Sequence, residues 1–342
     1  MASLLTRHYR QTCLLLTLKP QRLMLAILLA LTFLSPVFGL NLAAATELQQ
    51  HEVMAAGHPL TLWEKSPANP IGQILLLHGR TWSSIPDFDL QVQDEDLSFM
   101  DGLTALGYRV FALDARGYGQ SPRDASGWLT PDRAAQDTAQ VIAWITARHK
   151  EDLHLYGWSY GSMIAQLVVQ RAPTSVKSVM LFGYPFDPTR HLADPAMQYP
   201  ALPPAKTNTA SMAASDFIVP GAISQQAIQA YVLAALKADP VRVDFKNLHE
   251  WAELDARLIT TPTLLLQGEF DPLAPTVRQA EFFTHIPQAQ KWWVVLPGGD
   301  HAALLETPRG QMLQAMDSFI RALPTTIDDN KNPRSLEGET DV

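Results

Sequence analysis

The sequence predicts an α/β protein built on a mostly parallel, doubly wound sheet. Short apolar runs of the kind found in strands buried on both faces recur along the chain. They lie at residues 74–77, 108–113, 153–156, 176–182, 263–266 and 292–296. Segments with helical periodicity separate them, at 132–148, 161–171 and 307–322. Alternation of strand and helix favours parallel strands with helices on both faces.

The first 45 residues differ from the rest. Basic residues precede an apolar run at 23–34, and Ala43, Ala44 and Ala45 follow it. This order is typical of a secretory signal, and we expect cleavage after Ala45. The alternative is an uncleaved membrane anchor at 23–40, although Pro36 and Gly39 interrupt its end. The expected location is periplasmic or secreted, or membrane-anchored if the segment remains.

Cleavage changes the charge and the cysteine content. The 26 basic residues fall to 22 against 34 acidic ones, a formal net charge of about −12. An acidic protein of this kind repels nucleic acid and anionic lipid, so no nucleic-acid partner is expected. The single cysteine, Cys13, is removed with the signal. Disulfides and cysteine catalysis are therefore excluded for the mature chain.

Residues 46–323 are predicted to form one domain. It begins with a hairpin at 52–64 that turns at Gly57. Residues 187–260 interrupt the strand–helix rhythm, with helix-like stretches at 224–240 and 245–258, and are interpreted as a helical insertion over the sheet. Residues 324–342 lack an apolar period and are interpreted as a flexible acidic tail.

The pentapeptide GWSYG at 157–161 lies between a predicted strand and a predicted helix. In that setting Ser159 occupies a sharp turn that lifts its hydroxyl above the sheet. A serine nucleophile needs a base and an orienting carboxylate. Asp271 and His301 each follow a later strand at the same sheet edge, and Asp187 ends the strand before the insertion as an alternative acid.

Four motifs together resemble the α/β-hydrolase superfamily. They are HGRTW at 78–82, DARGYGQS at 114–121, GWSYG at 157–161, and the pair GEFD at 268–271 and GGDH at 298–301. The resemblance implies Ser159 as nucleophile, Asp271 as acid and His301 as base. It further implies an oxyanion hole formed by the backbone N–H groups of Arg80 and Tyr160. The position of the insertion resembles a helical cap between the sixth and seventh family strands.

Other side chains near these motifs have two interpretations. Trp82 and Trp158 are candidate substrate-binding residues or packing residues, and His78 is interpreted as structural. The insertion carries a polar-aromatic cluster that usually marks a solvated helix face, at His249, Glu250, Trp251, Glu253 and Asp255. No histidine spacing suits a metal, and no glycine-rich phosphate loop follows a strand, so neither a metal nor a cofactor is predicted.

These features predict an exported serine hydrolase that acts on a small-molecule carboxylic ester through an acyl-enzyme. The same residues would serve an aminopeptidase, lactonase, carbon–carbon bond hydrolase or haloperoxidase-like enzyme. In an aminopeptidase, Glu250, Glu253 or Asp255 would bind the substrate amine. A non-catalytic binding protein on the same fold is the alternative from another functional class. The sequence gives no oligomeric state.

Overall fold

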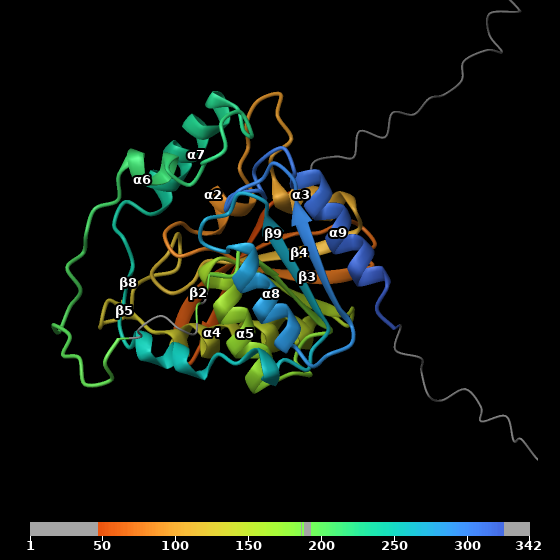
Figure 1. The fold of residues 1–342 in the computed structure, drawn as a ribbon. Coiled ribbons are helices and arrows are strands. Elements are labelled where there is room, and N and C mark those ends of the chain that lie inside the picture. Colours follow the sequence, from red (N-terminus) through yellow and green to blue (C-terminus); the bar gives the residue numbers. More distant parts are fainter. Residues whose placement is uncertain (1–46, 186, 188–192, 325–342) are drawn as a thin grey trace, which may run out of the picture. The chain divides into compact units, whose positions relative to one another are not determined.

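The computed structural model describes residues 47–185, 187 and 193–324 (Figure 1). The predicted signal or anchor at 1–45 and residues 325–342 of the predicted tail lie outside the described residues. Within the described ranges, no helix is both long enough and apolar enough to cross a membrane.

A mostly parallel sheet runs through the described chain, as the sequence predicts. Its order is β1-β2-β4-β3-β6-β7-β9-β10, and only the β1–β2 and β2–β4 pairs are antiparallel. The predicted hairpin is formed by the first two strands. The strands are β1 (Gln49–Ala55), β2 (His58–Lys65), β3 (Gly72–Leu77), β4 (Tyr108–Leu113), β6 (Leu153–Trp158), β7 (Ser178–Phe182), β9 (Thr263–Gly268) and β10 (Lys291–Leu296).

Helices cover both faces of this sheet (Figure 1). Side chains alternate along β3, so Leu75 and Leu77 pack in one apolar core while Ile74 and Leu76 pack in the other. The first core is completed by α4 (Pro131–Arg148), α5 (Tyr160–Arg171) and α8 (Thr276–His285). The second is completed by α2 (Ser84–Phe88), α3 (Phe99–Ala105) and α9 (Arg309–Arg321).

The insertion leaves the sheet between β7 and β9, the sixth and seventh sheet strands in chain order. Its described part contains α6 (Ala210–Ala214) and α7 (Gln225–Ala238), which pack together in Figure 1. Asp239, at the end of α7, accepts a hydrogen bond from the backbone N–H of Ser83 at 2.8 Å. The insertion is therefore tied to the loop that precedes α2.

The predicted helix at 245–258 is wrong. Asp244–Phe245 forms a short strand, β8, that pairs with β5 (Trp128–Leu129). Asn247 then adopts a left-handed backbone with φ of 57°. Two 3-10 turns follow, at Leu248–Glu253 and Ala256–Leu258. Strand pairing and the left-handed residue both interrupt the backbone bonding that a continuous helix would need.

The run at 292–296 is a strand, but it is not buried on both faces as predicted. It belongs to β10, which pairs with β9 and ends the sheet order. Trp292 and Val295 are 39% and 42% exposed. The edge position explains the difference, because only one neighbouring strand and partial helix cover shield these side chains.

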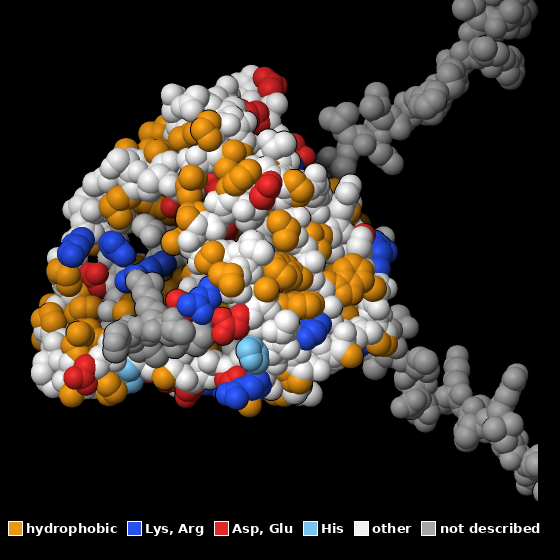
Figure 2. Space-filling view, viewed as in Figure 1, with side chains coloured by type: hydrophobic (Ala, Val, Ile, Leu, Met, Phe, Trp, Pro, Cys, Tyr) orange, Lys and Arg blue, Asp and Glu red, His pale blue; other side chains and the backbone are white. Residues whose placement is uncertain are grey.

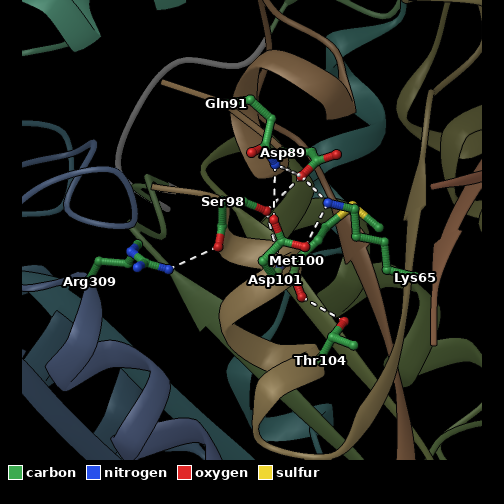
Figure 3. Close-up of polar contacts among 8 residues, drawn as sticks. All are labelled: Lys65, Asp89, Gln91, Ser98, Met100, Asp101, Thr104 and Arg309. Carbon is green, nitrogen blue, oxygen red and sulfur yellow. Dashed lines mark hydrogen bonds and ion pairs between the residues drawn. The ribbon is translucent and has the colours of Figure 1, made fainter. Parts of the chain in front are cut away.

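A buried lysine fixes the segment that joins α2 to α3 (Figure 3). Lys65 Nζ lies 2.6 Å from Asp89 Oδ1 and 2.7 Å from Asp101 Oδ1. Ser98 Oγ donates to Asp89 Oδ1 at 2.6 Å, and Arg309 Nη1 donates to the Ser98 carbonyl at 2.9 Å. These bonds join β2, α3 and α9 around Asp89, which follows α2 directly.

Candidate active site

Ser159 stands between β6 and α5 in a strained backbone conformation, with φ of 54° and ψ of −116°. Its N–H donates to the carbonyl of Phe182 at 2.8 Å, which fixes the turn against β7. Both flanking glycines are needed, since a Cβ on Gly157 or Gly161 would lie 2.3 Å from a backbone oxygen. A strained non-glycine residue held by its surroundings is a frequent mark of a functional site.

His301 and Asp271 form a buried pair, with 2.8 Å between His301 Nδ1 and Asp271 Oδ2. The other carboxylate oxygen, Oδ1, accepts the N–H groups of Leu273 and Ala274 at 2.8 and 3.1 Å. The carboxylate is thus held by three donors and fixes the orientation of the imidazole. Asp187, the alternative acid, lies instead 3.5 Å from a guanidinium nitrogen of Arg278.

Two further residues restrict the position of the imidazole. Trp158 Nε1 donates to the backbone carbonyl of His301 at 2.7 Å. Gly183 follows β7 with φ of 58°, and a Cβ there would lie 2.9 Å from His301 Cε1 and 3.2 Å from Asp271 Oδ2. The absence of a side chain at Gly183 therefore makes room for the pair, a requirement that the sequence analysis missed.

Ser159 and His301 both line a cavity of about 470 Å³, a volume suited to a small organic ligand. The loop after β3 borders the same cavity through Gly79 and Arg80. A Cβ on Gly79 would lie 3.7 Å from Ser159 Cβ, so this loop passes beside the serine. Tyr160, the other residue predicted to supply an oxyanion N–H, is the first residue of α5. The structure thus brings all five predicted catalytic and oxyanion residues to one place.

His78 holds the loop after β3 in position. Its Nε2 accepts the N–H of Ala115 at 3.0 Å, and its Nδ1 donates to the Gly79 carbonyl at 2.8 Å. Burial lowers the pKa of His78 to about 4, so the ring is neutral at pH 7. The hydroxyl of Tyr118 donates to the carbonyl of Arg80. These contacts agree with the structural interpretation of His78.

Tryptophans line much of the cavity. The predicted substrate-binding residues Trp82 and Trp158 are buried and form part of the lining. Trp251 lines it too, although its sequence cluster indicated a solvated face. Two acids that the sequence analysis also missed, Asp87 and Asp216, complete this side of the cavity. No local pattern marks them, because Asp87 lies in α2 and Asp216 follows α6, about 130 positions later in the chain.

Asp300 connects the insertion to the histidine loop. It is fully buried, and its Oδ2 accepts the N–H groups of Ile218 and Val219 at 2.6 and 2.8 Å. Its own N–H donates to Glu306 Oε2 at 3.0 Å. Burial raises the pKa of Glu306 to about 8, so this carboxyl is mostly neutral at pH 7. The segment that bears Asp216 is thereby attached next to His301.

Comparisons with known proteins agree with this geometry. The family described as serine aminopeptidase, S33, matches residues 68–308. A pimeloyl-[acyl-carrier protein] methyl ester esterase of Aeromonas hydrophila is 23% identical over 238 residues, covering 62% of this chain and 85% of the relative. The enzyme of the same name from Aeromonas salmonicida is 25% identical over 242 residues, covering 63% and 86%.

Solved structures show the same fold. A thermophilic esterase from Thermogutta terrifontis superimposes with a TM-score of 0.56 at 19% identity, covering 81% of this chain and all of that one. A bacterial membrane phospholipase A superimposes with a TM-score of 0.58 at 20% identity, covering 89% and 99%. The fold, the strained serine and the extent of the family match lead to one conclusion: this chain is an α/β-hydrolase-fold serine hydrolase of the serine aminopeptidase S33 family.

Proposed function

We propose that this protein is an exported hydrolase of carboxylic esters that uses Ser159, His301 and Asp271 as its catalytic triad. The observation that carries the proposal is the arrangement of the cavity. A strained serine and a histidine line it together, and the histidine is oriented by a buried carboxylate at 2.8 Å. Export rests on the sequence alone and is tested by the mass of the mature protein, with cleavage expected after Ala45.

The reaction follows from these positions. His301 removes the proton from the Ser159 hydroxyl as that oxygen attacks the ester carbonyl, and Asp271 stabilises the resulting imidazolium. The N–H groups of Arg80 and Tyr160 donate to the developing oxyanion. His301 then protonates the departing alcohol and leaves an acyl-enzyme on Ser159. Water activated by the same imidazole releases the acid.

The two Aeromonas relatives support the choice of a carboxylic ester as the substrate, because both are methyl ester esterases. The acids proposed to bind an amine in an aminopeptidase are engaged elsewhere. Glu250 accepts the N–H of Asp132 at 2.8 Å, Glu253 pairs with Arg171, and Asp255 pairs with Arg257. None of these three acids is among the residues that line the cavity.

The test is covalent labelling of the purified protein with a fluorophosphonate probe, beside a Ser159→Ala variant. We expect stoichiometric labelling of the native protein and none of the variant, with loss of 4-nitrophenyl acetate hydrolysis in parallel. A folded native protein that neither reacts with the probe nor hydrolyses the ester would refute the proposal and favour a non-catalytic binding protein. Lactones and aminoacyl amides, tested next, separate the remaining hydrolase classes.

A further inference from the structure

One wall of the cavity carries side-chain donors that the proposed ester hydrolysis does not use. Arg80, Tyr160 and Trp251 line the cavity there, and Phe245 packs against them. The ring centroid of Tyr160 lies 4.4 Å from that of Phe245 and 5.0 Å from that of Trp251. The guanidinium of Arg80 lies over the same Phe245 ring, 5.4 Å from its centroid. The side chains of Arg80 and Tyr160 therefore pack on one shared ring.

The hydroxyl of Tyr160 is a buried donor without an acceptor. Tyr160 is 7% exposed, and its Oη has no hydrogen-bond partner among the described residues. Burial raises the pKa of Tyr160 well above its usual range, so the phenol keeps its proton at neutral pH and remains a donor. An unpaired buried donor is costly, and in a ligand cavity an acceptor oxygen of the ligand can satisfy it.

The guanidinium of Arg80 also lacks an acceptor. It forms neither an ion pair nor a hydrogen bond with any described residue. Arg80 is also the only lysine or arginine among the described residues that line the cavity. Guanidinium and phenol donors on one wall match the acceptor oxygens and the charge of a carboxylate.

Further basic side chains lie next to this wall. Arg242 and Lys246 flank β8, the strand that supplies the shared ring. The N–H of Arg242 donates to the Lys206 carbonyl at 2.8 Å, and Arg123 Nη2 donates to the Arg242 carbonyl at 3.0 Å. None of these four basic side chains forms an ion pair with a described acid, although Asp244 lies in β8 itself. Figure 2 shows basic side chains gathered on the side of the molecule where Figure 1 places β8. This side of an acidic protein therefore attracts anions.

The three acids of the cavity lining do not neutralise the donor wall. Asp187 pairs with Arg278. Burial raises the pKa of Asp87 well above its usual range, so its carboxyl is neutral at pH 7. Asp216 accepts a hydrogen bond from Trp82 Nε1 at 3.0 Å. Besides burial, the pKa of the phenol on the donor wall responds to the neighbouring guanidinium and to none of these three acids. The acids therefore lie apart from the donor wall.

We propose that Arg80 and Tyr160 form a subsite for a carboxylate carried by the ester substrate. The guanidinium of Arg80 supplies the countercharge, and the phenol of Tyr160 donates to one carboxylate oxygen. This inference rests on the proposed esterase function and names its substrate class, a monoester of a dicarboxylic acid or an acylated hydroxy acid. The basic side chains around β8 attract such an anion towards the cavity. The experiment distinguishes a carboxylate on the acyl group from one on the alcohol.

The test compares esters that differ only in charge, because a carboxylate and a carboxamide have nearly the same shape. On the acyl side, the pair is the mono-4-nitrophenyl ester of adipic acid and the 4-nitrophenyl ester of adipamic acid. On the alcohol side, the pair is 5-acetoxypentanoate and 5-acetoxypentanamide, followed by acetate release. We expect kcat/KM to favour the anionic member of one pair by about tenfold at pH 7.5. That ratio should fall towards 1 in Arg80→Gln and should fall in part in Tyr160→Phe.

The matched control is Arg148→Gln. Arg148 also lies over an aromatic ring, 3.8 Å from the centroid of Trp144, but it does not line the cavity. This variant should keep the native ratio. The ratio is read rather than the absolute rate, because Arg80 and Tyr160 also supply the proposed oxyanion donors. A displaced backbone at either residue would slow both members of a pair equally.

Each result has a definite meaning. Ratios near 1 for both pairs in the native protein overturn the subsite, and hydrolysis of the carboxamide esters then leaves the proposed function intact. A native preference for the anion that persists in Arg80→Gln also overturns the subsite. If no ester is hydrolysed, calorimetric titration of the native protein and of Arg80→Gln with hexanoate and hexanamide decides between the two proposals. A preference for hexanoate that is lost in Arg80→Gln would support the subsite and refute the esterase, and any other binding pattern would overturn both.

Discussion

Replacing Gly183 with alanine tests whether the space beneath the His301–Asp271 pair is required for activity. The new Cβ would lie 2.9 Å from His301 Cε1, 3.0 Å from Nδ1 and 3.2 Å from Asp271 Oδ2. Ordinary carbon contacts are about 3.5–4.0 Å, so the imidazole must move by roughly 0.5–1 Å. A misplacement of about 1 Å can cost about 10²-fold in rate, and we expect a loss of that order in kcat/KM.

The backbone contributes a separate effect, since Gly183 has φ of 58° and alanine there costs about 1–2 kcal/mol of folding free energy. Gly298→Ala is the matched control, because Gly298 has φ of 75° and a Cβ there meets nothing within 4 Å. Both variants are assayed with 4-nitrophenyl acetate and by urea unfolding. Equal kcat/KM for the two variants would refute the steric reasoning, whatever their stabilities.

Two predictions concern stability. Lys65→Ala removes the cation from the buried Asp89, and we expect a loss of about 3–5 kcal/mol in unfolding free energy, measured in urea. Burial lowers the pKa of His154 from 6.5 to about 4, so the unfolded state binds the proton first as the pH falls. The contribution of His154 to the unfolding free energy is therefore fully present above pH 6.5, and it has fallen by about 3 kcal/mol at pH 4. The unfolding free energy of the native protein minus that of His154→Gln should therefore fall between pH 6.5 and pH 4.

Both predictions have internal controls. Arg257→Ala breaks a solvent-exposed ion pair with Asp255 and should change the urea midpoint far less than Lys65→Ala. Similar midpoints for the two variants would contradict the buried-pair reasoning. At each pH, the unfolding free energy of His154→Gln is subtracted from that of the native protein. The subtraction is needed because burial also raises the pKa of Asp114 to about 6, and this group changes stability with pH in the opposite direction to His154. A native-minus-variant difference that stays constant from pH 7 to 4 would rule out the titration of His154.

The local pattern of the sequence was enough to predict the sheet and its principal helices. Apolar runs such as 74–77 and 108–113 fall within β3 and β4, because a strand buried on both faces needs apolar side chains at every position. The same reasoning overstated the burial of 292–296. A run of apolar residues does not show whether a strand is central or at an edge, since strand order depends on contacts between distant segments.

The insertion shows the same limit. Residues 224–240 have a helical pattern and contain α7, whereas 245–258, also predicted to be helical, form the end of a short strand and two 3-10 turns. The pairing of β8 with β5 and the left-handed Asn247 decide the latter segment. The partner strand lies more than 100 residues earlier, so no window around 245–258 contains the cause.

The sequence by itself determined the fold class and the residues most directly linked to the chemistry. Ser159, Asp271 and His301 stand in short motifs because a tight turn or strand end imposes local requirements on its neighbours. Only the tertiary structure placed Asp271 rather than Asp187 against His301. The acidic and aromatic lining of the cavity also follows only from the tertiary structure. Its residues come from segments far apart in the chain, so they share no local sequence pattern.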